Sequence, residues 1–181
     1  MLHDEKKRRG ESRGRSFTID VAYAFRLPAG IAGDINRAQQ VVVRPEIIGT
    51  ATPPTAYGLA VVIDATTGYL RVPTTTDATI NGFLARPFPT NSVTPGALGA
   101  TTPPTSSMGD LMMRGFMSEL LQNTTPAING GQVYIYVGAT SGSRIQGGIE
   151  AAAGANLIAI TGCLFSGPAD ASGFTEISYL P

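Results

Sequence analysis

The clearest pattern along the chain is the alternation of apolar and polar side chains in residues 130–138, Gly-Gly-Gln-Val-Tyr-Ile-Tyr-Val-Gly. Successive side chains of a β-strand point to opposite faces. One face is an apolar row made of Val133, Ile135 and Val137. The other face carries Tyr134 and Tyr136, whose rings favour an apolar surface and whose hydroxyls favour water or a polar partner. The pattern therefore predicts a strand that is covered on both sides, by another sheet or by another protein.

Shorter runs of β-branched and aromatic residues, bounded by Gly and Pro, recur along the chain and predict about nine or ten strands without a strong helix. The predicted strands cover residues 16–27, 40–48, 58–63, 69–72, 80–88, 111–121, 130–137, 145–150, 157–165 and 174–179. Turn signals separate them every 8 to 15 residues. This spacing predicts an all-β fold: a jelly-roll-like sandwich or barrel of short antiparallel strands with an extended N-terminal arm.

The positions of proline and glycine make the predictions for three of these segments more specific. Pro45 cannot donate to a strand ladder, so we place the segment 40–48 at a sheet edge or at a bulge. Residues 64–68 end in Gly and join the flanking strands in a hairpin. The composition of 111–121 favours a helix, but Gly115 and the alternation permit a strand. Its neighbours favour a strand that continues by a hairpin into the next one.

Two connecting segments have their own signals. Residues 89–110 are rich in Thr, Ser, Pro and Gly. Connections longer than about 12 to 15 residues without their own structure are usually functional or mobile. We therefore interpret this segment as a surface loop that contacts a partner. Residues 33–37 are predicted to form a turn or a single helical turn, with Asp34 as its N-cap.

Charge is scarce and unevenly distributed. Charged residues make up 14% of the chain, against about 25% in a typical soluble protein. This suits a loop-rich β protein, and it also suits a surface that is covered in an assembly, because interface cores are depleted in charge. The formal net charge is zero, but residues 1–16 carry +3 and the remainder carries −3. All cations of the remainder are arginines, which are suited to bidentate pairing at interfaces.

The chain divides into a basic arm, residues 1–16, and one β domain, residues 17–181, which is long enough to bury its own core. The arm is polar and is expected to be disordered alone, and it spans about 50 Å when fully extended. It is either an inert tail or a segment that docks on an acidic neighbour. Its interleaved acids make a weak signal for nucleic acid. The cations of the arm are Lys6, Lys7, Arg8, Arg9, Arg13 and Arg15.

Candidate chemistry is defined mainly by what is missing from the sequence. His3 is the only histidine and lies in the arm, and Cys163 is the only cysteine, in a context that predicts a small buried hydrophobic residue. There is no phosphate loop, dinucleotide fingerprint or zinc spacing, so we expect no cofactor and no metal. Acidic pairs are not clustered, and no Trp is present to stack a sugar. We therefore expect no enzyme. No apolar run suits a signal peptide or a membrane span, so we expect a soluble product of the cytoplasm with no membrane partner.

Several segments together resemble a known family. They are Leu-Pro-Ala-Gly at 27–30 with Gly-Asp-Ile-Asn-Arg-Ala at 33–38, Pro-Pro-Thr-Ala-Tyr-Gly at 53–58, Gly-Phe-Leu-Ala-Arg-Pro-Phe-Pro-Thr at 82–90, Arg-Gly-Phe-Met at 114–117, and Gly-Gly-Gln-Val-Tyr-Ile-Tyr-Val at 130–137. In this order the chain resembles the structural cement proteins of tailed-bacteriophage heads. The resemblance covers about residues 17–179 and does not include the arm.

The resemblance implies a β-sandwich or jelly-roll-like protein on the outside of a capsid. Such a protein bridges neighbouring major capsid subunits, often as a dimer. We expect the arm and the loop 89–110 to contact the capsid, and a tyrosine-bearing sheet face or an edge strand to form a homodimer. The candidate partner-binding residues are Lys6, Lys7, Arg8, Arg9, Arg13, Arg15, Arg37, Arg86, Tyr134 and Tyr136.

Two other hypotheses remain open. The first is a tail-associated module of the virion that recognises a receptor or a glycan through its loops. The second is a β-sandwich adaptor without a viral role. In none of the three hypotheses do we expect a nucleic-acid partner.

Overall fold

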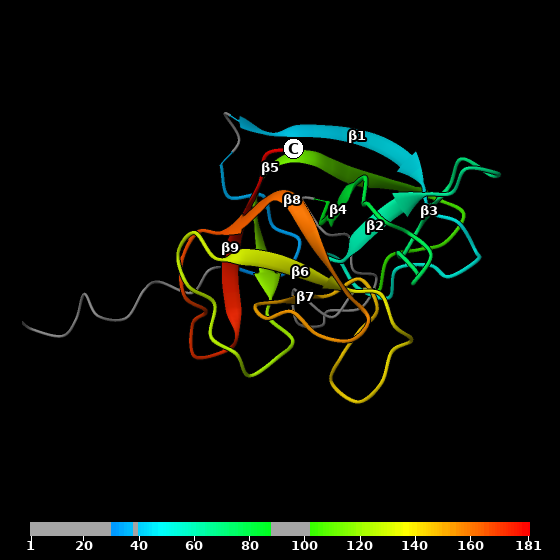
Figure 1. Ribbon diagram of the computed structural model, residues 1–181. Coiled ribbons are helices and arrows are strands. Elements are labelled where there is room, and N and C mark those ends of the chain that lie inside the picture. Colours follow the sequence, from blue (N-terminus) through cyan, green and yellow to red (C-terminus); the bar gives the residue numbers. More distant parts are fainter. Residues whose placement is uncertain (1–29, 38–39, 88–101) are drawn as a thin grey trace, which may run out of the picture.

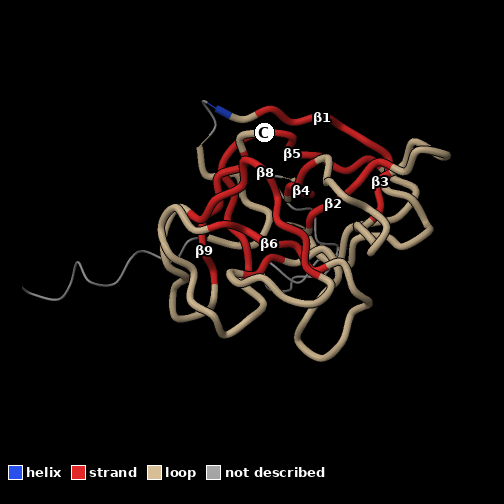
Figure 2. Tube along the Cα trace, in the orientation of Figure 1, coloured by secondary structure: helices blue, strands red, loops and turns tan. Residues whose placement is uncertain are grey.

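The computed structural model describes residues 30–37, 40–87 and 102–181. In these residues nine strands pair in one antiparallel sheet that curls into a half-barrel (Figures 1 and 2), and no α-helix occurs. The strands are β1 (Val42–Ile47), β2 (Ala60–Ile63), β3 (Leu70–Arg71), β4 (Gly82–Ala85), β5 (Met108–Leu120), β6 (Gln132–Tyr136), β7 (Ile149–Glu150), β8 (Leu157–Phe165) and β9 (Phe174–Tyr179). The all-β prediction is confirmed. The described part of the chain contains no helix long and apolar enough to cross a membrane.

Strand β5 is the spine of the sheet. Its first half pairs with β1 along one edge and with β4 along the other. Its second half pairs with β9, while a single bridge joins Met117 to Ile35 on the edge shared with β1. The strand order is therefore β3-β2-β4-β5-β9-β8-β6-β7, with β1 attached to β5 beside this path. Both edges of β5 are occupied, so every other strand is positioned relative to it.

Gly115 marks the point where β5 changes partners. Pairing with β4 reaches Met112, and pairing with β9 begins at Gly115 itself. The φ angle of Gly115 is +145°, a conformation that side chains with a Cβ rarely adopt. A Cβ at this position would lie 3.0 Å from Cγ2 of Val41 and 3.2 Å from Sδ of Met112. The glycine thus allows the spine to turn from one half of the sheet to the other.

Single β-bridges connect the two end strands of the sheet path, β3 and β7, to the residues that follow β1 and β5. Ile48, directly after β1, bridges to Leu70 of β3. Leu121, directly after β5, bridges to Ile149 of β7. Both bridges are parallel, unlike the strand pairs. They hold the ends of the sheet path against β1 and β5 and so maintain its curvature.

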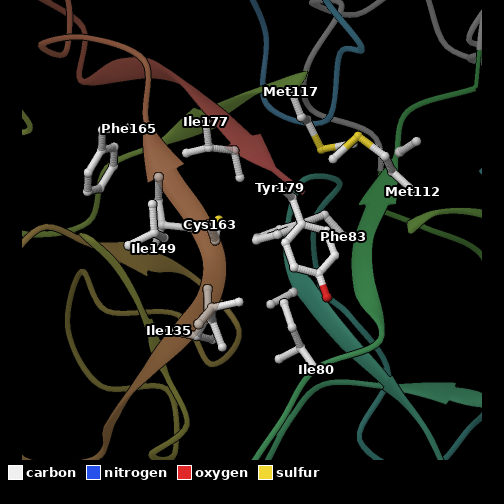
Figure 3. Close-up of a cluster of buried hydrophobic side chains, with 14 of the residues drawn as sticks. Ile80, Phe83, Met112, Met117, Ile135, Ile149, Cys163, Phe165, Ile177 and Tyr179 are labelled. Atoms are coloured by element: carbon white, nitrogen blue, oxygen red, sulfur yellow. The ribbon is translucent and has the colours of Figure 1, made fainter. Parts of the chain in front are cut away.

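Two hydrophobic clusters use opposite faces of the same strands. In the larger cluster (Figure 3), side chains of β4 and β5 meet those of β6, β8 and β9. Phe83 and Tyr179 make an edge-to-face contact there, with ring centroids 5.6 Å apart. The larger cluster includes Val133, Ile135, Val137 and Cys163, all buried as predicted. The smaller cluster consists of Ile48, Tyr57, Val61, Leu70, Leu84 and Leu111.

Several predicted elements are confirmed. The segment 111–121 is a strand, residues 64–68 join a hairpin, and β1 is an edge strand with a register irregularity between Val42 and Val43. The arm, the predicted strand 16–27 and most of the loop 89–110 lie outside the described residues.

Other expectations are wrong. The chain does not pass from β5 to β6 by a hairpin, because β9 and β8 lie between them in the sheet. Residues 108–110 belong to β5 rather than to the loop, and the predicted strand 145–150 is reduced to Ile149 and Glu150. Asp34 caps no helix. Its carboxylate accepts a hydrogen bond from the backbone N–H of Ile31, which precedes it, at 3.3 Å.

Replacing Gly115 with Ala is expected to destabilise the fold by about 1 to 3 kcal/mol, because the new Cβ meets Val41 and the backbone must adopt a strained φ. Urea unfolding of the purified variant measures this. The matched control is Gly154→Ala in an exposed bend, which should change stability by less than about 0.5 kcal/mol. Equal stabilities of the two variants would contradict the role assigned to Gly115.

Candidate interaction surface

The outer edge of β1 is unpaired within the described residues. Ile48 donates its N–H to the carbonyl of Ser107, so it faces β5. Because strand residues alternate in the direction of their backbone groups, Val43, Pro45 and Ile47 face the free edge. Pro45 has no N–H, and its missing donor therefore lies at this edge rather than in the ladder. A proline in this position disfavours the addition of another strand.

Exposed apolar side chains gather on and beside β1. They account for five of the nine large hydrophobic side chains that are exposed in the described residues. We call this group the β1 surface, and its members are Val42, Val43, Ile47, Tyr69 and Met108. Met108 is 60% exposed and lies opposite Ile47 in the β1–β5 register. Ile47 and Tyr69 line one hollow of about 210 Å³. Val42 lies on the opposite face of the sheet from Val43 and Ile47, because successive side chains of a strand alternate between its faces.

Arg114 lies opposite Val42 in the register, on the other face of the sheet from Ile47 and Met108. Its side chain is exposed, and no carboxylate of the described residues pairs with it. Each of the other five described arginines has a carboxylate within 4.0 Å. Those pairs are Arg37–Glu176, Arg44–Glu46, Arg71 with Asp64 and Asp77, Arg86–Asp34 and Arg144–Glu150. Arg114 is thus the described arginine whose charge remains available.

Arg37, a predicted partner-binding residue, attaches the start of the described chain to the sheet. Its Nη2 lies 2.6 Å from Oε1 of Glu176, and its guanidinium lies 4.1 Å from the ring centroid of Phe116. Asn36 donates to the other oxygen of Glu176 at 3.0 Å. The side chain of Arg37 is nevertheless 54% exposed. Arg37 therefore stabilises the fold through Glu176 and Phe116, while about half of its side chain remains accessible to a partner.

Arg86, another predicted partner-binding residue, is largely internal. Its side chain is 6% exposed, and its Nε and Nη2 donate to the carbonyl of Ala32 at 3.2 Å. Its guanidinium lies 5.0 Å from the ring centroid of Tyr57 and 3.7 Å from the carboxylate of Asp34. Nη1 is buried without a hydrogen-bond partner. These contacts hold residues 32–34 against the end of β4 and leave little of Arg86 for another protein.

The two predicted tyrosines differ in exposure. Tyr134 is half-buried, whereas Tyr136 is 6% exposed. The Tyr136 hydroxyl donates to the carbonyl of Ala139 at 3.1 Å, and the guanidinium of Arg144 lies 4.3 Å from its ring centroid. The cover over Tyr136 is therefore the chain's own loop after β6, not a second sheet or another protein. The arm cations from Lys6 to Arg15 lie outside the described residues.

Glu119 is a buried acid that sequence reasoning did not identify. Its Oε1 is buried without a hydrogen-bond partner, and its carboxylate packs against the backbone of Gly58. Burial raises the pKa of Glu119 well above 4.5. Burial also raises the pKa of the Cys163 thiol far above its usual range. In the described residues no three His, Cys, Asp or Glu side chains are grouped so that they could hold a metal ion.

The residues of the β1 surface were also missed from the sequence. One signal was present, since the run Val41-Val42-Val43 lacks the polar alternation of a strand with a water-facing side. The positions of Tyr69 and Arg114 beside β1 could not be predicted from the sequence, because they result from the pairing of segments that are far apart in the chain.

Comparisons with known proteins give two positive findings. The model of the XM1 gp53 minor capsid protein family matches residues 21–179. A chain from the solved structure "The capsid of Myoviridae Phage XM1" has a similar fold, with a TM-score of 0.63 and 19% sequence identity. The similarity covers 82% of this chain and 91% of that chain. No curated protein matches the sequence significantly.

The raised pKa of Glu119 predicts a pH-dependent stability. Above pH 4.5 the carboxyl of the unfolded chain ionises while the buried one resists ionisation, so stability falls as the pH rises from 4.5 toward the folded-state pKa. Glu119→Gln removes this ionisation. We expect the variant to gain more in melting temperature relative to wild type at pH 8 than at pH 4. The control Glu46→Gln removes a partly exposed carboxylate on β1 and corrects for the loss of one acidic group. An equal difference at both pH values for Glu119→Gln would contradict the assignment.

Proposed function

Because the chain belongs to the XM1 gp53 minor capsid protein family, and is thus a capsid-associated structural protein of a bacteriophage virion, we propose that it is a cement protein. It binds the outside of the assembled capsid and bridges neighbouring major capsid subunits. The observation that carries the proposal is the family match across residues 21–179. The exposed apolar groups of the β1 surface, on a chain with few charges, give further support.

A bridging role needs no chemical turnover. A ligand that binds one state of a system stabilises that state, so a protein that binds only the assembled lattice increases its resistance to disruption. Each contact can be weak, because binding to one subunit places the second contact at a high effective concentration. An antiparallel half-barrel with both ends tied back provides a body that holds its contacts at fixed distances.

We assign the capsid contacts to the basic arm and to the loop 89–107 before β5, with Arg37 as a further contact near the start of the described chain. The arm would reach an acidic neighbour over a distance of about 50 Å. We assign a homodimer contact to the sheet face that carries Tyr134, because the free edge of β1 is blunted by Pro45 and Tyr136 is covered internally. Neither nucleic acid nor a membrane is required.

A tail-associated module that recognises a receptor or glycan is the second candidate. The observation in its favour is a hollow of about 460 Å³ lined by Gln122, Asn123, Thr124, Thr125, Ser143 and Arg144 among others. Amides and hydroxyls of this kind can bind sugar hydroxyls. None of the described residues that line the hollow is aromatic, so a sugar ring would have no face on which to stack. This favours the cement role.

The location of the protein on virions separates the two candidates. We expect gold-labelled antibody against this chain to decorate the heads of intact particles in electron micrographs. Particles made without the gene serve as the control. Labelling confined to the tail would support the second candidate, and intact particles without label would contradict both.

Deletion of residues 1–16 is expected to reduce retention on purified heads, because the arm supplies a charge of +3. The loss should be greatest at low salt, where surface charges are least screened. Co-sedimentation with heads across a salt series measures this. A full-length variant with the six cations replaced by Gln separates the effect of charge from that of length. Undiminished retention of the deletion variant at physiological salt would remove the arm from the proposed contacts.

A further inference from the structure

We propose that the hollow beside β7 is a binding site for a carboxylate, which an acidic side chain of a protein partner presents. The hollow has a volume of about 460 Å³ and is lined by Gln122, Asn123, Arg144 and Glu150 among others. The chemistry of the site follows from these described residues alone. That the partner is a component of the phage head rests on the proposed function.

Arg144 presents its guanidinium in a fixed orientation. Its Nε donates to Oε1 of Glu150 at 2.6 Å, and its guanidinium carbon lies 4.3 Å from the ring centroid of Tyr136. Its backbone is held by a bridge to Ser141. Neither Nη1 nor Nη2 donates to a group of the described residues. Two donors of a guanidinium are therefore left for a ligand, and their planar geometry suits the two oxygens of a carboxylate.

Two side-chain amides of the hollow have their acceptors occupied. Oε1 of Gln122 accepts a hydrogen bond from the backbone N–H of Ile145 at 2.6 Å. Oδ1 of Asn123 accepts one from the backbone N–H of Ala151 at 3.4 Å. These bonds establish which end of each amide is the oxygen, since a flipped amide would oppose two donors. The amino groups of both amides have no acceptor within the described residues, so they remain available as donors.

The ligand must therefore supply acceptors. A carboxylate has two acceptor oxygens and no donor. Glu150 is the one acid among the described residues that line the hollow, and Arg144 is the one cation. Because the two are paired, the site has no excess positive charge. This favours a singly charged carboxylate over a phosphate, whose second charge would be repelled by Glu150 without a compensating cation.

The shape of the hollow favours a side chain on a protein over a free small molecule. Small-molecule sites usually enclose most of the ligand with apolar and aromatic walls. Here residues 153–155 form an exposed part of the rim, and none of the described lining residues is aromatic. A side chain on a protein surface needs no such enclosure, because the neighbouring contacts of the partner keep it at a high effective concentration.

A second copy of this chain does not supply the carboxylate through a two-fold contact of this hollow. Such a contact brings the same patch of both copies together. The only acid in the described lining is Glu150, which is 4% exposed and is paired with its own Arg144. The contact would therefore oppose two sets of donors without an acceptor. The proposed partner is a different protein.

The test uses substitutions that remove a donor of the site and keep the acceptor that the fold uses. Asn123→Asp and Gln122→Glu retain an oxygen for the backbone N–H and replace the amino group with a second oxygen. Arg144→Lys keeps a cation beside Glu150 and removes the planar pair of donors. The control is Asn129→Asp, which adds the same charge as Asn123→Asp at an exposed turn outside the hollow. Circular dichroism melts establish that all variants fold.

The probe is a capped pentapeptide with one Glu among four Ala, compared with the same peptide in which Gln replaces Glu. We expect saturable NMR shifts of the side-chain amides of Asn123 and Gln122 in the full wild-type chain. Affinity should fall by at least about tenfold for the Gln peptide and for each site variant, because a charge-assisted hydrogen bond is lost. Asn129→Asp should bind as wild type. The inference is overturned by equal binding of the two peptides, by tighter binding of inorganic phosphate than of the Glu peptide, or by the absence of saturable shifts.

Co-sedimentation with heads that lack the protein tests the source of the carboxylate. We expect Asn123→Asp and Gln122→Glu to be retained less than wild type and Asn129→Asp to be retained equally. Site variants that lose the peptide but keep full retention would overturn the assignment of the partner to the head. Wild-type protein that does not bind heads would overturn the cement role, whereas the peptide titration still decides the site. If the variants change only the oligomeric state in light scattering, the occupant is a second copy and the inference is wrong.

Discussion

The structure depends on the pairing of β5 along both of its edges. A strand of 13 residues carries β1 and β4 on its first half and β9 on its second. The change of partner requires the backbone to turn within a strand, and Gly115 supplies a φ of +145° at that point. All other strands are placed relative to this bent spine, so the curvature of the sheet and the position of its free edge follow from it.

The same arrangement determines the character of the surface. Because alternate side chains of β2, β4 and β5 enter two separate clusters, these strands are apolar on both faces and leave little room for charge. The charges that remain are mostly neutralised within the chain, since five described arginines have a carboxylate nearby. What is left is a surface with few unpaired charges, in which β1 contributes the main exposed apolar group. Such a surface suits adhesion to a large partner better than the binding of small charged ligands.

Internal polar contacts explain why some arginines and tyrosines are not free for partners. Arg86 donates its hydrogen bonds to the carbonyl of Ala32 and packs on the ring of Tyr57. The guanidinium of Arg144 covers the ring of Tyr136. These residue types are common both in interfaces and in the anchoring of loops. The sequence does not distinguish the two uses, because the distinction depends on which loop folds back onto the side chain.

The all-β class, most strand positions, the edge position of the strand with Pro45, the buried row of β6 and the resemblance to phage head proteins could all be predicted from the amino-acid sequence. These are local properties: alternation, the missing N–H of proline and the order of turn motifs act over a few residues. Three features became visible with the tertiary structure alone: β9 and β8 separate β5 from β6, Asp34 caps no helix, and Tyr69, Met108 and Arg114 lie beside β1. These features arise from pairing between segments far apart in the chain. Burial of both faces of the bent strand β5 stabilises this pairing more than a local hairpin between β5 and β6 would.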